Sequence, residues 1–197
     1  MDESILTFWF GDDVEKVSQA TVKRWFRTDP AFDQEIAQRF GKLQKAASTG
    51  AFEDWKERAK GRLALLLVLD QFSRNLHRSS PLAWANDERC QELTLEGVEL
   101  GQDKELSTIE RIFFYMPMQH SERRDHQDRS VELYAELVEG LSGPEQGFAR
   151  RSLESARYHR ELVHTHGRFP HRNAILGRDT TPKERAYLDA LPPGKAF

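Results

Sequence analysis

The sequence has little cysteine, no long apolar run and no excess of one charge sign, and each shortage excludes a class of protein. Cys90 is the only cysteine, so no disulfide can form within the chain. The longest aliphatic run, residues 63–69, is far shorter than the roughly 20 residues of a membrane-spanning helix. The 29 basic and 32 acidic residues give a net charge of −3, which offers no global field for nucleic acid or acidic lipid.

The first four residues include two acidic ones, Asp2 and Glu3, and carry neither the basic nor the apolar part of a secretory signal. We therefore expect a soluble, cytoplasmic protein with no membrane and no nucleic-acid partner. Cys90 is expected to be a buried small side chain and not a reactive thiol.

Common catalytic motifs are also missing. No two glycines lie two positions apart, which excludes the dinucleotide fingerprint, and no phosphate-binding loop occurs. The chain has no His-Glu-x-x-His, no Gly-x-Ser-x-Gly and no His-Asp dipeptide. These absences remove the usual nucleotide-binding, zinc-protease, esterase and helical metal-phosphohydrolase interpretations.

Helix signals, in contrast, recur along the whole chain, while no alternating run of Val, Ile and Thr is long enough for a sheet. Asp29-Pro30 marks a helix start, and Ser107 with Glu110 and Thr181 with Glu184 form capping boxes. We predict a single all-α domain over 1–191, with roughly seven to nine helices packed as tetratricopeptide-like hairpins, and a short tail at 192–197. The expected helices lie near 3–10, 18–27, 30–49, 61–76, 81–101, 127–140 and 145–166. One more helix begins at the capping box of Ser107, and a last one begins at Pro182 and is stopped by Pro192.

A first polar cluster ends the Leu-rich helix at 61–76. Asp70 and Arg74 lie one turn apart, with Gln71 and Asn75 beside them. In one interpretation Asp70 and Arg74 form an ordinary surface pair. In the other, the four side chains form the floor of a polar pocket, because polar groups beside a Leu-rich core need partners.

A second cluster surrounds Pro117. Ile109, Phe113, Met116 and His120 form one stripe that turns His120 toward the core, with Ser121 next to it. Pro117 predicts a kink or break that frees backbone carbonyls. His120 is then either a core residue that satisfies such a carbonyl, or a general acid/base.

The third cluster, residues 164–173, is rich in histidine and arginine. Gly167 predicts a helix end, and Pro170 predicts a loop after it. No carboxylate lies in this segment, so we expect no metal site and no cofactor. Arg168, Arg172 and Arg178 favour recognition of an anion, since a guanidinium binds carboxylate or phosphate through two hydrogen bonds.

Three functions remain open. The first, which we favour by analogy with helical folds of this kind, is a binding module for a small anionic ligand or peptide in a polar pocket. The second is a hydrolase-type enzyme with His120 as general acid/base, Asp70 or Glu110 setting its protonation, and Arg172 stabilising negative charge. The third is a scaffold without a small-molecule site. The oligomeric state stays open, and a homodimer is one option, because Trp9 and Trp25 suit a core or an interface. The candidate ligand-binding residues are Asp70, Gln71, Arg74, Asn75, His120, Ser121, His171, Arg172 and Asn173.

These segments together resemble a bacterial family, domain of unknown function 924, which has a tetratricopeptide-like helical fold. The resemblance lies in residues 5–11, 25–26, 69–75, 110–121, 167–173 and 175–178. Met118 stands where such families commonly have Leu in the motif Met-Pro-x-x-His-Ser. The resemblance implies an all-α single domain. It implies no reaction, so it assigns no catalytic residue.

Overall fold

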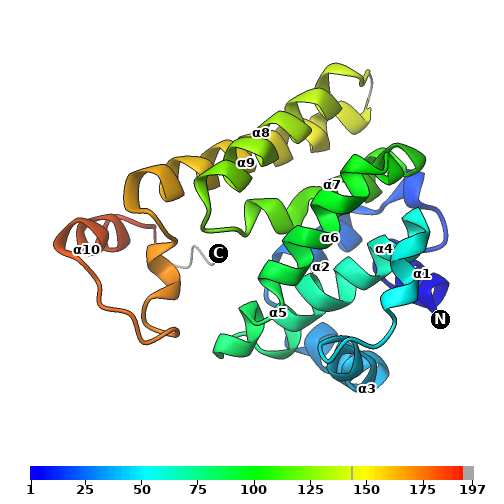
Figure 1. Ribbon diagram of the computed structural model, residues 1–197, viewed down its shortest axis with the longest axis horizontal. Helices are drawn as coiled ribbons and strands as arrows, with labels where there is room; N and C mark the ends of the chain where they lie inside the picture. The colour runs from blue at the N-terminus through cyan, green and yellow to red at the C-terminus, as the bar shows by residue number, and fades with distance from the viewer. Residues whose placement is uncertain (143, 193–197) are drawn as a thin grey trace.

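The computed structural model describes residues 1–142 and 144–192, and within these ranges the chain is helical and contains no strand. Figure 1 shows the helices in chain order. The α-helices are α1 (Asp2–Phe10), α2 (Gln19–Phe26), α3 (Pro30–Ala47), α4 (Ala59–Leu66), α5 (Ser73–Leu76), α6 (Asp87–Glu99), α7 (Thr108–Gln119), α8 (Arg124–Glu139), α9 (Pro144–His166) and α10 (Pro182–Asp189). Short turns named η1 (Val14–Lys16), η2 (Glu53–Glu57), η4 (Pro81–Trp84), η5 (Gln102–Glu105) and η6 (Pro170–Arg172) connect them.

The central helix runs without interruption over residues 59–76. Its middle, η3 (Leu67–Phe72), is a π-helical segment that joins α4 to α5. Counted as one helix, this stretch brings the described residues to nine α-helices, within the predicted seven to nine. Side chains from Leu63 to Val68 are all at most 1% exposed, because helices cover this segment on every side.

Aromatic rings from the N-terminal helices fill the core around this central helix. The indole of Trp9 packs against Trp25, Phe72 and Phe113. Trp25 also donates from Nε1 to the carbonyl of Trp9 at 3.0 Å. Both tryptophans are buried within the chain, so they belong to the core and offer no surface for a dimer.

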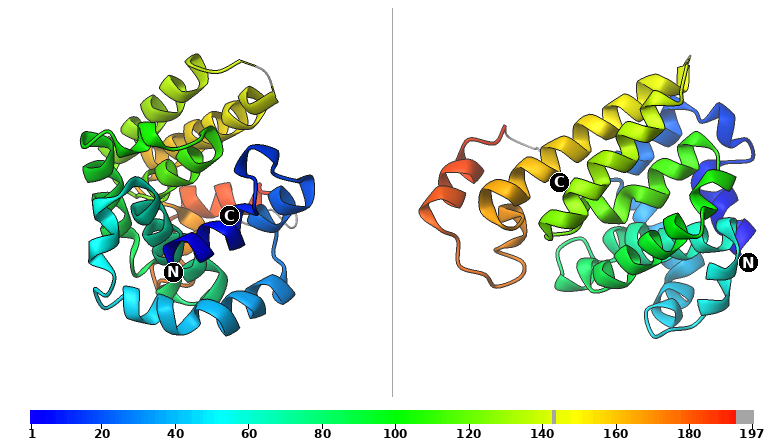
Figure 2. Two further views of the ribbon diagram at one scale, coloured as in Figure 1. Left: turned by 90° about the vertical axis from the view of Figure 1, so that its right-hand side faces the viewer. Right: turned by 45° about the horizontal axis from the view of Figure 1, so that its top comes forward.

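Helices α8 and α9 lie side by side as a hairpin across α7, as the views of Figure 2 agree. Beyond α9, a second and smaller apolar cluster forms from Leu162, Val163 and Phe169, with Tyr158 and Tyr187 packed against it. It holds α10 at the end of the molecule opposite α1 (Figure 1).

Most of the expected boundaries hold, and both capping boxes are present as predicted. The segment expected to be one helix over 81–101 is instead divided into η4 and α6. Helix α7 passes through Pro117 and ends only two residues later, at Gln119, so the proline does not break it there. No helix in the described ranges is long and apolar enough to cross a membrane. The tetratricopeptide-like arrangement stays a prediction, and the predicted tail lies outside the described residues from position 193 on.

Candidate functional site

The π-helical segment places Asp70 at the centre of a buried polar network. Asp70 is only 2% exposed, yet its carboxylate has three side-chain partners. Arg74, one turn later, contributes an NH1 atom at 2.8 Å from Oδ1, and Gln71 donates its amide N–H to Oδ2. A single π-turn inside a helix is frequent at functional sites, because it turns side chains away from regular helical spacing. Asp70 is therefore a buried and fully partnered carboxylate.

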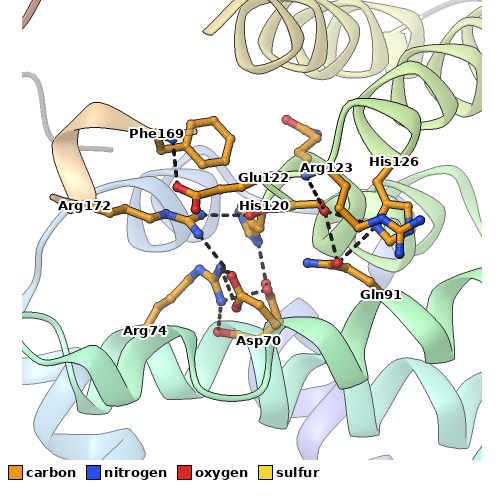
Figure 3. A network of polar contacts seen from close by, with 12 residues as sticks. Asp70, Arg74, Gln91, His120, Glu122, Arg123, His126, Phe169 and Arg172 are labelled. Atoms are coloured by element: carbon orange, nitrogen blue, oxygen red, sulfur yellow. Dashed lines mark hydrogen bonds and ion pairs between the residues drawn. The ribbon is translucent and has the colours of Figure 1, made fainter. Parts of the chain in front are cut away.

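The third partner of Asp70 is His120, at the C-terminal end of α7. The imidazole Nδ1 lies 2.8 Å from Oδ1 of Asp70. A dashed line joins the two side chains in Figure 3. An ionised carboxylate only accepts hydrogen bonds, so Nδ1 carries the proton and Nε2 of the neutral ring carries the lone pair. No group in the described part of the chain hydrogen-bonds to Nε2. His120 thus contacts a carboxylate and not a carbonyl freed by Pro117.

The charges around this pair keep Asp70 ionised and His120 neutral. Burial by itself would raise the pKa of Asp70, but the charge of Arg74 and the contacts with His120 and Gln71 together outweigh it, and the pKa lies well below its ordinary value. Burial lowers the pKa of His120, and the positive charge of Arg74 lowers it further, against the opposing effect of Asp70. At neutral pH the imidazole is therefore an unprotonated base.

Arg172 joins the C-terminal part of the chain to the same network. Its NH2 donates to the carbonyl of His120 at 3.0 Å, and its NH1 lies 3.3 Å from Oδ2 of Asp87. The guanidinium also lies over the rings of Trp84 and Phe169. Burial lowers the pKa of Arg172 to about 10, so it stays charged at neutral pH.

Asp87, at the start of α6, links the two arginines. Both its oxygens accept from Arg74, at 3.0 and 3.1 Å, while Oδ2 also faces Arg172. Burial raises the pKa of Asp87, and the arginines oppose that effect. Two carboxylates and two guanidiniums therefore alternate from Asp70 through Arg74 and Asp87 to Arg172.

A pocket of about 910 Å³ opens beside this network. His120, Ser121 and Arg172 are the sequence-predicted residues that line it. Most of the residues that line it are polar or charged, and the apolar ones come mainly from the segment around η4. The other residues that line it are Pro81, Trp84, Ala85, Asp87, Glu88, Gln91, Glu92, Leu95, Glu122, Arg123, Asp125, His126, Arg129 and Leu176.

A second set of hydrogen bonds forms on the pocket wall around Ser121. Its hydroxyl donates to Oε1 of Gln91 at 3.1 Å and accepts from the backbone N–H of Arg123 at 3.2 Å. Nδ1 of His126 lies 3.0 Å from both the Ser121 hydroxyl and Gln91 Oε1. Burial lowers the pKa of His126, and the charge of Arg123 adds to the effect. Ser121 is fully engaged in bonds within the chain.

The backbone beneath the site is held by Gln127, which is fully buried in α8. Its amide N–H group donates to the carbonyls of Gln119 and Ser121, at 2.8 and 2.6 Å. These carbonyls flank His120 at the end of α7, where a helix leaves its last carbonyls without partners. Gln127 therefore fixes the backbone on both sides of the imidazole.

Four predicted site residues lie outside this arrangement. Glu110 sits ten residues before His120 on α7, about 15 Å away along the helix, where it closes the capping box with Ser107 and pairs with Lys60. The Asn75 amide donates to Asp33 on α3. Buried Asn173 accepts from Arg178, and His171 stacks beside Phe169 without lining the pocket. These residues connect segments of the fold.

The other two arginines of the C-terminal loop are also paired. Arg168 binds Glu184 through two contacts, at 2.6 and 3.0 Å, and Arg178 binds Glu122 at 2.6 and 3.0 Å. With Arg172 on Asp87, each guanidinium has a carboxylate of this chain as its partner. Because these guanidiniums are already paired within the chain, they no longer favour an anion as the ligand. In the described ranges, no three His, Cys, Asp or Glu side chains are grouped so as to hold a metal ion.

Asp87, Gln91 and His126 were not named from the sequence. Asp87 and Gln91 are four positions apart, as are Gln91 and Leu95, so all three share one face of the expected 81–101 helix. Polar residues on a face that also carries leucine were a usable signal. No sequence signal indicated His126, because its role depends on the contact between the start of α8 and α6.

The fold and the site define an all-α domain with a buried Asp–His pair beside a polar pocket. A family model, described as bacterial protein of unknown function (DUF924), matches residues 5–191, and the chain belongs to this family. It is similar to the solved structure of protein of unknown function ATU0120 from Agrobacterium tumefaciens, with 36% identity and a TM-score of 0.81. That match covers 95% of this chain and 96% of the other. No curated protein matches the sequence.

Proposed function

We propose that this protein is a hydrolase-type enzyme in which His120 acts as the general base of the pocket. One observation carries the proposal: the 2.8 Å contact between Asp70 and Nδ1 leaves Nε2 as the basic atom of a residue on the pocket wall. A carboxylate on the far nitrogen fixes the tautomer and the ring orientation that a general base needs.

The reaction follows from this geometry. Nε2 of His120 takes a proton from a water molecule in the pocket, and the water oxygen bonds to the electrophilic atom of the substrate. The bond to the leaving group then breaks, and the proton on Nε2 passes to that group. Asp70 stabilises the imidazolium that exists between the two proton transfers. Arg172, whose NH1 and NH2 face Asp87 and the carbonyl of His120, acts as a positioning residue.

A ligand-binding role without turnover is the second candidate, and the pocket supports it. Its volume of about 910 Å³ suits a small molecule or a short peptide. Because the loop arginines are paired, a polar peptide or neutral metabolite fits the wall better than a small anion. A thermal-shift screen tests this candidate, since a ligand at 100 times its Kd adds about 2.7 kcal/mol to the free energy of unfolding.

The proposed enzyme is tested with the full chain against chromogenic carboxylic esters, amides and phosphate esters. We expect turnover of one of these classes, and a loss of about 10²- to 10⁴-fold in kcat for His120→Asn. Added imidazole should restore part of the lost rate. The rate of the wild-type chain should rise with pH through a pKa below that of free histidine and then level off.

His164→Asn is the matched control, because His164 also pairs with a carboxylate, Asp128 at 3.1 Å, but lies outside the pocket. Its kcat should equal that of the wild-type chain. Wild-type protein that turns over none of the three classes, or folded His120→Asn protein with full activity, would contradict the proposal.

A further inference from the structure

The carboxamide of Gln91 has one end fixed and the other end free. Its Oε1 accepts from the Ser121 hydroxyl and from Nδ1 of His126, at 3.1 and 3.0 Å. An amide oxygen has two lone pairs, so these two donors satisfy it. The orientation of the amide group is thereby defined by two separate side chains.

The protonation of His126 is consistent with this arrangement. The Ser121 hydroxyl has one hydrogen, which it donates to Gln91 while it accepts from the N–H of Arg123. Nδ1 of His126 lies at hydrogen-bond distance from two acceptors, the hydroxyl oxygen and Gln91 Oε1. An unprotonated Nδ1 would face the amide oxygen with a lone pair, so the hydrogen is on Nδ1. His126 and Ser121 therefore both direct donors at one atom of Gln91.

The opposite end of this amide, Nε2, has no acceptor in the described part of the chain. Gln91 is 7% exposed, and what is exposed belongs to a residue of the pocket wall. In Figure 3 the amide nitrogen is directed to the side of His120 and Asp70, while the oxygen faces His126. This N–H group therefore faces the pocket without a partner from the chain, and an oxygen of a bound molecule can accept its hydrogen bond.

We propose that Gln91 donates this N–H to the oxyanion of a carboxylic ester or amide substrate, an inference that rests on the proposed function. His120 takes a proton from water, the water oxygen bonds to the carbonyl carbon, and the π electrons of the C=O bond move to its oxygen. Gln91 Nε2–H stabilises the resulting oxyanion. The C=O bond then re-forms, the bond to the alcohol or amine breaks, and this group takes the proton from His120.

The charge of the pocket favours a carbonyl substrate over a phosphate ester. A transferred phosphoryl group carries charge on three oxygens and is usually held by cations. Here NH1 and NH2 of Arg172 already face partners within the chain, its Nε is buried away from solvent, and Arg123 is paired with Asp125. One neutral amide donor, in contrast, matches the single oxygen on which charge develops at a carbonyl.

The variant Gln91→Glu tests the role of the donor. It keeps an oxygen acceptor for Ser121 and His126 and replaces the N–H group by a second oxygen, which adds a negative charge. Gln91→Met removes the donor without adding charge, so a loss shared by both variants reports on the missing N–H. With an ester or amide substrate turned over by the wild-type chain, we expect kcat to fall by about 10²- to 10³-fold in both variants, with little change in KM. Gln38→Glu, on the exposed face of α3, is the control and should keep full activity.

A thiono substrate gives a second measurement, because sulfur is a weak hydrogen-bond acceptor. Replacing C=O by C=S should slow the wild-type chain more than it slows Gln91→Glu. Two results overturn this inference while leaving the general base intact: turnover of phosphate esters only, or ester turnover that both Gln91 variants retain. Absence of turnover on every class overturns the proposed function and this inference together.

Discussion

Arg172 holds the backbone of His120 from a position 52 residues further along the chain, through the 3.0 Å bond between its NH2 and the His120 carbonyl. The side chain of His120 is meanwhile held by Asp70, from 50 residues earlier. His120 is thus held at its backbone carbonyl by the C-terminal loop and at its imidazole Nδ1 by the central helix. This double attachment makes the site sensitive to changes in either segment.

Replacing Asp70 by Asn should reduce kcat by about 10²- to 10⁴-fold, because an amide can stabilise the wrong tautomer of His120 and cannot stabilise its charged form. Loss of the buried carboxylate also leaves Arg74 with fewer partners, which costs about 3–5 kcal/mol of stability. Steady-state kinetics below the melting temperature separate the two effects. Asp33→Asn is the control, since Asp33 binds Asn75 and Arg78 outside the pocket and its loss should leave kcat unchanged.

Replacing Arg172 by Met should lower the free energy of unfolding by about 3 kcal/mol, because Asp87 loses one of two cationic partners in a buried setting. Chemical denaturation measures the change. The exposed pair of Arg123 and Asp125 provides the comparison, and Arg123→Ala should leave the midpoint unchanged. Equal midpoints for the two variants would show that the Arg172 contacts contribute nothing to stability.

The stability of the protein should fall in mild acid because of His171. Burial, helped by the charge of Arg172, lowers the pKa of His171 to about 3 in the folded chain, against about 6.5 when unfolded. Between these values the unfolded chain binds a proton that the folded chain does not, so the free energy of unfolding decreases as pH drops from 6.5 toward 3. His171→Phe should make this dependence shallower, measured by urea unfolding at several pH values. Parallel curves for the two proteins would rule out this contribution.

Two helical glycines should respond in opposite directions to Ala. A Cβ at Gly97 would lie 2.5 Å from the Phe114 ring and 2.6 Å from the buried Arg62 side chain, so the variant should lose about 1–3 kcal/mol. A Cβ at Gly41 meets nothing within 4 Å, so Gly41→Ala should gain about 0.5–1 kcal/mol from helix propensity. Thermal melts of both variants provide the comparison, and a stabilised Gly97→Ala protein would contradict the packing described for α6.

Local signals in the sequence predicted much of the helical architecture. The capping boxes at Ser107 and Thr181 begin α7 and α10 because each satisfies free N–H groups within four residues. The π-helical segment escaped prediction, since residues 67–72 continue the regular helical pattern of the Leu-rich segment before them. The division of 81–101 into η4 and α6 likewise had no signal in the helical pattern.

The candidate site was harder to predict because its contacts join distant segments. Sequence analysis offered Asp70 or Glu110 as the partner of His120, and the structure places Asp70 against it, while Glu110 lies at the other end of α7. Helix geometry alone excludes Glu110 as the partner of His120, because the two lie ten residues apart on the same helix and their side chains cannot meet. Position cannot reveal that the central helix and α7 bring Asp70 to His120, nor that α6 contributes Gln91.

The apolar cluster around Phe169 is separate from the main core, so we expect it to open as a cooperative unit of its own. Residues 167–190 depend on this small cluster and on ion pairs, whereas Leu63 to Val68 lie in the main core. Segments with few apolar contacts open at a lower free energy than the whole domain, so backbone amides near η6 should exchange with solvent before those of the central helix. Each such opening removes Arg172 from the His120 carbonyl, which means that the fraction of molecules with an assembled site is set by this weaker unit and not by global stability.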